Sequence, residues 1–163
     1  MKCDEHLIYK ATNTDIESIV NFIDTYYRKD YFLPKSKVVR MVTGEVDPKF
    51  GNNRKPLNVW ISRDKNGISG VAFVTLSKTL IQLLVRPDCR KIGVGSKLIE
   101  FSCPEHIRCK IDTSTGDPTG FYYNNGFLEY QSTIDGNKAI CGKNNNILIL
   151  HKSKTKPGGG DAR

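Results

Sequence analysis

The sequence predicts a single α/β domain in which a mixed sheet carries helices on both faces. Three observations support this fold class. The chain has 163 residues, a length that suits one domain with its own core. Short apolar strand patterns alternate with helical patterns, an order typical of helices that pack on a sheet. The clearest unit, residues 79–101, is a strand, a glycine-containing loop and a helix in succession.

The predicted elements follow from periodicity and from turn residues. Helical segments repeat apolar residues every three or four positions, whereas strands are short apolar runs between glycine, proline and polar residues. In chain order we expect a strand at 7–11, a helix that ends near residue 27, a helix at 35–42, strands at 57–62 and 68–76, a strand at 80–85, a helix from 93 to 101, a strand at 107–112, a helix at 118–125, a strand at 127–133 and a strand at 147–151.

Caps and breakers delimit the amino-terminal half. Threonine and asparagine side chains at residues 12–14 suit the start of the first helix, and Pro34 and Gly44 bound the second. Residues 47–56 are polar and contain glycine and proline, so we expect a loop there. An Asn-Gly turn within residues 64–67 separates two apolar runs, which is the pattern of a β-hairpin.

The carboxy-terminal half is punctuated in the same way. Pro87 stops a buried apolar strand, and Gly93 opens the next helix. Pro118 opens a short helix that Gly126 closes with a left-handed cap. A turn at residues 135–137 precedes the last strand.

The loop after the central strand reads Arg90-Lys91-Ile92-Gly93-Val94-Gly95. Two glycines at the start of a helix let the backbone approach a ligand, and the N–H groups of the first turn point out of the helix. This arrangement predicts a phosphate-binding loop. A dinucleotide fingerprint needs a small residue where Leu98 stands, and a P-loop needs Gly-Lys-Ser/Thr where the chain has Gly95-Ser96-Lys97. Both of these nucleotide interpretations are weak.

Two segments resemble motifs of one family. Val85-Arg86-Pro87 followed by residues 90–95 resembles the signature of the GNAT acyltransferases, Arg/Gln-x-x-Gly-x-Gly/Ala after a strand that ends Val-x-Pro. Residues 121–127, Phe-Tyr-Tyr-Asn-Asn-Gly-Phe, resemble the late motif of that family. The resemblance implies a mixed, mostly antiparallel sheet of about seven strands. It also implies an acyltransferase that moves an acetyl group from acetyl-CoA to an amine.

The resemblance assigns cofactor contacts as well. In the GNAT fold the central strand and its neighbour splay apart, and the pantetheine arm lies in the gap. Main-chain groups would bind this arm at Leu83, Leu84 and Val85, and would bind the pyrophosphate at Arg90, Lys91, Ile92, Gly93, Val94, Gly95 and Ser96. For Arg90 and Lys91, solvated surface charge is the alternative. Thr115 stands where many members carry a cofactor-binding asparagine, so we expect a different or weaker contact there.

Tyr122 occupies the position at which family members place the tyrosine that protonates the departing thiolate. A phenol suits this task because it stays protonated near neutral pH. Tyr123 lies about 100° further around the helix and should face elsewhere. Residues 79–82 lack the glutamate that often serves as general base, and Asp112 is the best replacement, although a role in capping the strand end is favoured for it.

The resemblance places the acceptor beside the early helices. The candidate contacts are Tyr27, Tyr31 and Phe32, and packing in the core is the favoured alternative for all three. The acceptor, a small-molecule or protein amine, is not identified by any motif. The oligomeric state stays open between monomer and homodimer.

Composition limits the other classes of function. No apolar run approaches the ~18 residues of a membrane helix, and the first residues lack a signal-peptide core, so we expect a cytoplasmic protein without a membrane partner.

Five cysteines without Cys-x-x-Cys spacing predict reduced thiols and no metal site. We expect one domain at residues 1–152 and a disordered basic, glycine-rich tail at 153–163.

A net charge of +8 keeps one further hypothesis open. Basic clusters at residues 35–40 and 49–55 flank the expected acceptor side. The alternative is therefore a GNAT-like domain that binds or modifies a nucleic acid or another anionic macromolecule.

Overall fold

The computed structural model describes residues 6–27, 33–44, 46–47, 52–53, 56–110, 118–129, 133–134, 137–138, 142–144 and 147–152. Its helices are α1 (Ile16–Tyr26), α2 (Lys35–Thr43), α3 (Val94–Ser102) and α4 (Thr119–Asn124), with short 3-10 helices at Asn13–Asp15 and Pro87–Cys89. Its strands are β1 (Leu7–Lys10), β2 (Val46–Asp47), β3 (Asn52–Asn53), β4 (Asn58–Asp64), β5 (Gly67–Val74), β6 (Thr79–Val85), β7 (His106–Lys110), β8 (Phe127–Glu129), β9 (Thr133–Ile134), β10 (Asn137–Lys138), β11 (Gly142–Asn144) and β12 (Ile147–Lys152).

Eight strands pair into one sheet. Seven of them follow the order β1-β4-β5-β6-β7-β12-β11, and β8 pairs with β12 as well. The β6–β7 pair is parallel, and the other pairs of this sheet are antiparallel. The structure thus confirms the prediction of a mixed, mostly antiparallel sheet with helices on both faces.

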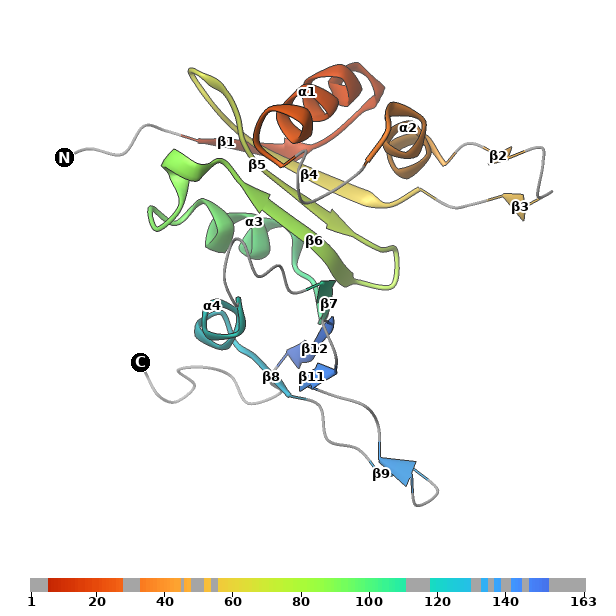
Figure 1. Ribbon diagram of the computed structural model, residues 1–163, viewed down its shortest axis with the longest axis vertical. Coiled ribbons are helices and arrows are strands. Elements are labelled where there is room, and N and C mark those ends of the chain that lie inside the picture. Colours follow the sequence, from red (N-terminus) through yellow and green to blue (C-terminus); the bar gives the residue numbers. More distant parts are fainter. Residues whose placement is uncertain are drawn as a thin grey trace.

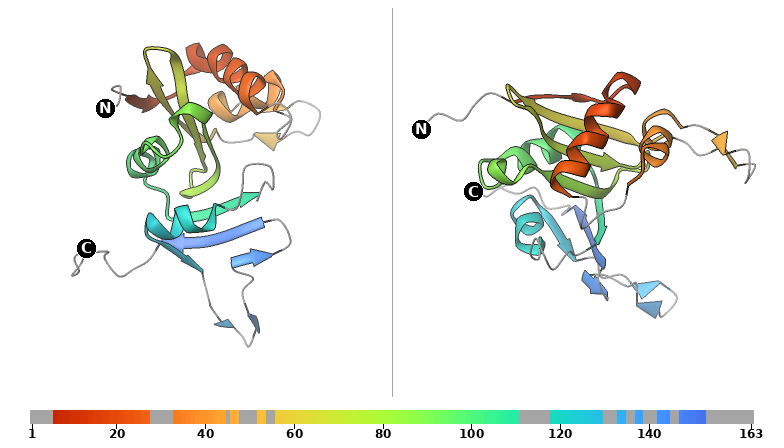
Figure 2. Two further views of the ribbon diagram at one scale, coloured as in Figure 1. Left: turned by 60° about the vertical axis from the view of Figure 1, so that its left-hand side comes forward. Right: turned by 45° about the horizontal axis from the view of Figure 1, so that its top comes forward.

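Helices cover the two faces of the sheet in separate groups (Figures 1 and 2). The α1 and α2 helices lie on one face, and α3 lies on the other. The two cores meet at β5, where Val71 and Phe73 pack with α1 and α2 while Ala72 and Val74 pack with α3. Because successive side chains of a strand point to opposite faces, β5 is buried on both.

Gly70 on β5 brings α3 close to the sheet. A Cβ atom at this position would lie 2.8 Å from Cδ1 of Leu98 and 3.1 Å from Cγ1 of Val94. Only glycine leaves room for these two side chains at that distance. The contact fixes the start of α3 beside the end of β6.

Helix boundaries agree with the capping residues that the sequence predicts. The N–H of Thr12 donates to Oδ2 of Asp15 at 2.9 Å ahead of α1. Gly44 follows α2 with a φ of 72°, and Gly126 follows α4 with a φ of 92°. Both glycines adopt the left-handed conformation that ends a helix.

Several short strands were not predicted. The expected loop at residues 47–56 contains part of the β2–β3 pair, β9 and β10 pair across residues 135–136, and β11 pairs with β12. Strands of two or three residues carry no detectable periodicity, so pairing rather than local sequence reveals them. The predicted tail at 153–163 lies outside the described residues.

The sheet divides between β6 and β7. These strands pair at Thr79 with His106 and at Leu80 with Ile107, and their register goes no further. A shift in the β5–β6 register falls at the same place, between Phe73 and Val74. An irregularity of this kind bends and twists a strand. Beyond Leu80, β6 therefore runs on with an open edge, which is the splay that the resemblance to the GNAT family implies.

Candidate functional site

A cavity of about 540 Å³ lies beside the open edge of β6. The loop after β6, the start of α3 and helix α4 complete its wall. Its lining residues are Tyr27, Leu83, Leu84, Val85, Cys89, Arg90, Lys91, Gly93, Gly95, Ser96, Pro118, Phe121 and Tyr122. The structure thus brings most of the predicted cofactor residues together with the predicted catalytic tyrosine.

The other predicted site residues lie elsewhere or outside the described chain. Ile92 is 43% exposed, and the side chain of Val94 is buried in the core beneath α3, so neither lines the cavity. The predicted residues outside the described ranges are Tyr31, Phe32, Asp112 and Thr115. Their roles remain predictions.

The main-chain groups of β6 alternate between the two edges of the strand. The N–H of Arg86 donates to the carbonyl of Ser69 at 2.8 Å, so this position faces β5. By alternation Leu84 also faces β5, whereas Leu83 and Val85 present their N–H and C=O groups to the open edge. Of the three predicted residues, Leu83 and Val85 therefore direct backbone groups to the open edge, where the Tyr27 hydroxyl binds those of Val85, and Leu84 forms part of the cavity wall.

The loop at the start of α3 has the backbone of an anion-binding site. Gly93 is the N-cap residue with a φ of 94°, and because glycine has no side chain it cannot cap the first N–H groups of the helix. A Cβ atom on Gly93 would meet no described atom within 4 Å. The first N–H groups of a helix have no intrahelical partner and lie at the positive end of its dipole. Arg90 and Lys91 add positive charge beside them.

Gly95 has a packing role in addition to the cofactor contact that the resemblance predicts for its backbone. A Cβ atom there would lie 3.0 Å from Cζ of Phe121. The missing side chain lets the aromatic ring of α4 close over the start of α3. Gly95 thus shapes the cavity by allowing two helices to approach each other.

Tyr122 is buried at the wall of the cavity and is oriented by its neighbours. Its ring contacts Phe121 and Phe127 edge-on, with centroids 5.2 and 6.3 Å away. Its hydroxyl lies 3.6 Å from Sγ of Cys109, and this thiol lies 3.6 Å from the carbonyl oxygen of Leu80. Burial raises the pKa of Cys109 to about 11, so the thiol stays neutral. Tyr123 is 41% exposed and faces away, as predicted.

Tyr27 reaches the same cavity from the end of α1. Its hydroxyl donates to the carbonyl of Val85 and accepts hydrogen bonds from the N–H of Val85 at 3.2 Å and from Nη2 of Arg90 at 2.9 Å. The side chain is buried. A single phenol thus connects α1, the open edge of β6 and the phosphate-type loop.

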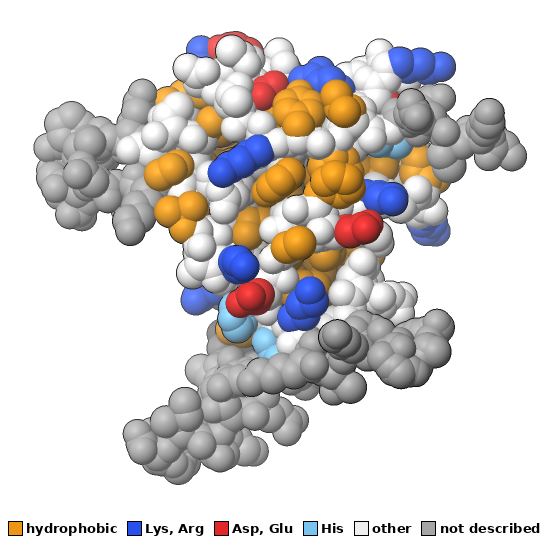
Figure 3. Space-filling view, turned by 180° about the vertical axis from the view of Figure 1, so that it is seen from behind, with side chains coloured by type: hydrophobic (Ala, Val, Ile, Leu, Met, Phe, Trp, Pro, Cys, Tyr) orange, Lys and Arg blue, Asp and Glu red, His pale blue; other side chains and the backbone are white. Residues whose placement is uncertain are grey.

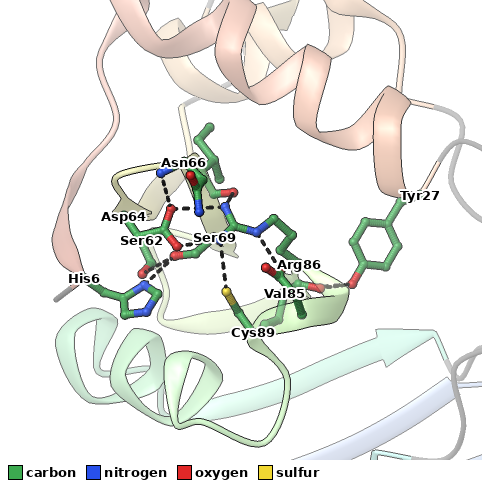
Figure 4. A network of polar contacts seen from close by, with 11 residues as sticks. His6, Tyr27, Ser62, Asp64, Asn66, Ser69, Val85, Arg86 and Cys89 are labelled. Atoms are coloured by element: carbon green, nitrogen blue, oxygen red, sulfur yellow. Dashed lines mark hydrogen bonds and ion pairs between the residues drawn. The ribbon is translucent and has the colours of Figure 1, made fainter. Parts of the chain in front are cut away.

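A buried ion pair anchors the turn after β6 (Figure 4). Arg86 contacts Oδ2 of Asp64 at 2.5 Å, Oδ1 of Asp88 at 2.7 Å and the carbonyl of Ile68 at 3.0 Å. The hydrogen bond from Arg86 holds the pKa of Asp64 below its usual value, and the two carboxylates raise the pKa of the guanidinium. The network ties the β4–β5 hairpin to the loop that bounds the cavity.

His6, Asp64 and Cys89 form a further cluster, with candidate ligand atoms within 4.8 Å of one another. Arg86 donates to Asp64 and, at 3.3 Å, to Sγ of Cys89. Burial raises the pKa of Cys89, which disfavours the thiolate that a metal would require. A cationic side chain thus already takes the place of a metal ion in this cluster.

Sequence reasoning missed several residues that shape this site. Arg86 occupies the x of the Val-x-Pro pattern, where the motif accepts any residue. Its partner Asp64 lies 22 residues earlier in the chain. Cys109 could have been noted because it shares a face of β7 with the buried Ile107. Phe121 precedes the tyrosine in the late motif, but local sequence does not reveal its contact with Gly95.

Comparisons with known proteins agree with this architecture. No protein family and no curated protein matches the chain by sequence. Its structure is similar to that of the ribosomal-protein-S18-alanine N-acetyltransferase from Escherichia coli, with 14% identity, a TM-score of 0.61 and coverage of 98% of this chain and 100% of that one. The PaiA N-acetyltransferase from Thermoplasma acidophilum, solved with coenzyme A, has 15% identity, a TM-score of 0.57 and coverage of 91% and 99%.

A GNAT-like decarboxylase, GphF, solved with isobutyryl-CoA, is similar too, with 15% identity, a TM-score of 0.59 and coverage of 90% and 98%.

None of the helices in the described ranges is long and apolar enough to span a membrane. The strand order, the splay between β6 and β7 and these similarities lead to one conclusion: the chain has the fold of the GNAT acetyltransferases.

Proposed function

We propose that this protein is an acyltransferase that moves an acetyl group from acetyl-CoA to an amine. The observation that carries this proposal is the cavity at the splay, which joins an uncapped helix start to the buried phenol of Tyr122. One end suits a diphosphate, and the other places an acidic O–H group in a largely apolar pocket.

The hydrogen-bonding groups at the cavity wall suit the diphosphate and the amide groups of coenzyme A. The backbone N–H groups of residues 90–96 would hold the diphosphate, and the open edge of β6 would pair with the amide-bearing pantetheine arm. The open space at Gly93 leaves the approach to these N–H groups clear. The similar structures solved with coenzyme A and isobutyryl-CoA support this choice of cofactor.

Acetyl-CoA would supply the acyl group as a reactive thioester. As the amine nitrogen bonds to the acyl carbon and the C–S bond breaks, Tyr122 gives its O–H proton to the departing sulfur. Asp112 is the proposed acceptor of the proton that the amine loses. Direct transfer of this kind needs no covalent enzyme intermediate.

The acceptor is proposed only as a class. N-acetyltransferases among the similar structures favour an amine, on a small molecule or a protein. Tyr31 and Phe32 remain the candidate contacts on the acceptor side. We place the enzyme in the cytoplasm as a monomer or homodimer.

An acceptor screen tests the proposal. Purified protein is incubated with acetyl-CoA and a panel of amines, peptides and proteins, and free thiol is measured. We expect one class of amine to release thiol and to gain an acetyl group by mass spectrometry. Thiol release without acetylation of any acceptor would contradict acyl transfer to an amine.

The alternative of nucleic-acid binding has less support. On the face shown in Figure 3, the lysine and arginine side chains are dispersed among apolar and uncharged ones. Lys35, from the first basic cluster, pairs with Glu17. Affinity for DNA or RNA that falls steeply with salt would favour the alternative.

A further inference from the structure

Tyr27 is the residue that follows the last turn of α1. Its side-chain hydroxyl uses all of its hydrogen-bonding capacity. Its O–H donates to the carbonyl of Val85, and its oxygen accepts from the N–H of Val85 and from Nη2 of Arg90. A phenolic hydroxyl has one proton to donate and accepts through its oxygen. These three bonds therefore leave no polar group for a contact with an acceptor, and the buried ring agrees with the core packing that the sequence favoured for Tyr27.

The position of Tyr27 is fixed on the apolar side as well. Its ring lies 6.0 Å from that of Phe22, which stands five residues earlier, and the side chain is buried. The N–H of Tyr27 donates to the carbonyl of Ile23 at 2.8 Å. The phenol is thus a rigid support, held by packing and by the backbone of α1.

The hydroxyl of Tyr27 is a neutral partner for the charge of Arg90. Among the residues that the structure describes, the ion pairs involve other cations, and none includes Arg90. Its Cζ lies 5.8 Å from the centroid of the Tyr27 ring, and both residues line the cavity. The guanidinium is therefore held at the cavity wall by a neutral partner, and a guanidinium carries five N–H donors, enough to bind an anion as well as the phenol.

We propose that Tyr27 is a positioning residue for the cofactor, because it holds the guanidinium of Arg90 toward the diphosphate bound at the start of α3. The inference rests on the proposed function and adds to it a side chain from the opposite face of the sheet. The Tyr27 hydroxyl also binds both the N–H and the C=O of Val85. The main-chain groups of Leu83 are therefore the ones with which the pantetheine arm pairs.

Calorimetry with two probes tests this role. Coenzyme A carries the diphosphate, whereas pantetheine lacks it. Loss of a hydrogen bond that orients a charged group weakens binding by about tenfold. We therefore expect Tyr27→Phe to raise the Kd for coenzyme A by this factor and to leave the Kd for pantetheine unchanged. Tyr26→Phe, on the exposed neighbouring position of α1, is the matched control and should bind both probes like the parent protein.

A double-mutant cycle with Arg90 separates positioning from a general effect on folding. Arg90→Gln, at an exposed position, should weaken coenzyme A binding, and adding Tyr27→Phe to it should cause no further loss. In steady-state assays Tyr27→Phe should raise KM for acetyl-CoA while kcat stays the same. Thermal unfolding of each variant identifies any loss of fold.

Three outcomes would overturn the inference. Additive losses in the cycle would show that Tyr27 acts independently of Arg90. Equal weakening of both probes would indicate a structural role. Tighter binding of coenzyme A by Tyr27→Phe would mean that the hydroxyl blocks Val85 and is displaced by the cofactor. Failure of the parent protein to bind coenzyme A would instead refute the proposed function.

Discussion

The sulfur of Cys109 lies 3.6 Å from the hydroxyl oxygen of Tyr122, at the point where β6 and β7 part. The same sulfur lies 3.6 Å from the carbonyl oxygen of Leu80, at the last paired position of β6. If the thiol donates to Leu80, its sulfur is left to accept the phenolic proton. The hydroxyl of the candidate acid thus lies within hydrogen-bonding distance of a sulfur atom at the splay.

Tyr122→Phe tests the proposed acid. The ring keeps its contacts with Phe121 and Phe127, so coenzyme A should bind with unchanged affinity, whereas kcat should fall by about 10²-fold. Tyr123→Phe removes the same hydroxyl from the exposed neighbour and should leave kcat unchanged. Equal turnover of Tyr122→Phe and the parent protein would remove Tyr122 from the mechanism.

Cysteine alkylation tests the environment of Cys109. With a pKa raised to about 11 by burial, its thiolate fraction at pH 8 is on the order of 10⁻³. Iodoacetamide at that pH should therefore modify the exposed Cys103 well before Cys109, as measured by peptide mass mapping. Modification of Cys109 at the rate of Cys103 would show that the splay is open to solvent and reagent.

Gly93→Glu should abolish coenzyme A binding. The glycine has a φ of 94°, which strains any side chain by about 1 kcal/mol, and the carboxylate would stand beside the N–H groups that bind the diphosphate. Gly120→Glu adds the same charge at an open position of α4 and should bind coenzyme A normally, by calorimetry. Retained affinity in Gly93→Glu would place the phosphates elsewhere.

Asp64→Asn should destabilise the fold by about 3 kcal/mol, because it leaves the buried guanidinium of Arg86 without its main carboxylate. Asp88→Asn removes the exposed partner and should destabilise the fold much less, because an exposed ion pair is screened by solvent. Urea denaturation at neutral pH measures both values. Equal losses of stability in the two variants would mean that the Arg86–Asp64 pair is no more important than the Arg86–Asp88 pair.

The same pair predicts a dependence on pH. The pKa of Asp64 is lowered in the folded state, so its contribution to stability is fully present above the unfolded pKa. The contribution is lost as the pH falls through the unfolded pKa, 3.8, toward the lower folded pKa. The parent protein should therefore lose more stability on acidification than Asp64→Asn does. Parallel pH profiles for the two proteins would contradict the pairing.

Local patterns predicted the parts of the site that are contiguous in sequence. Periodicity and the cap residues Gly93 and Gly126 located α3 and α4, and the motif spacing brought Tyr122 to the loop. The contacts of Tyr27 with Val85 and Arg90 join residues 58 and 63 positions apart, and no local pattern encodes them. The Arg86–Asp64 pair was missed for the same reason, since long-range partners are set by the packing of whole elements.

Titration of the parent protein with coenzyme A in a calorimeter tests the central claim most directly, because the proposed function requires the cavity at the splay to bind this cofactor. We predict saturable binding of one coenzyme A per chain that Gly93→Glu abolishes and Gly120→Glu retains. The absence of binding by the folded parent protein, or equal binding by Gly93→Glu, would contradict the account.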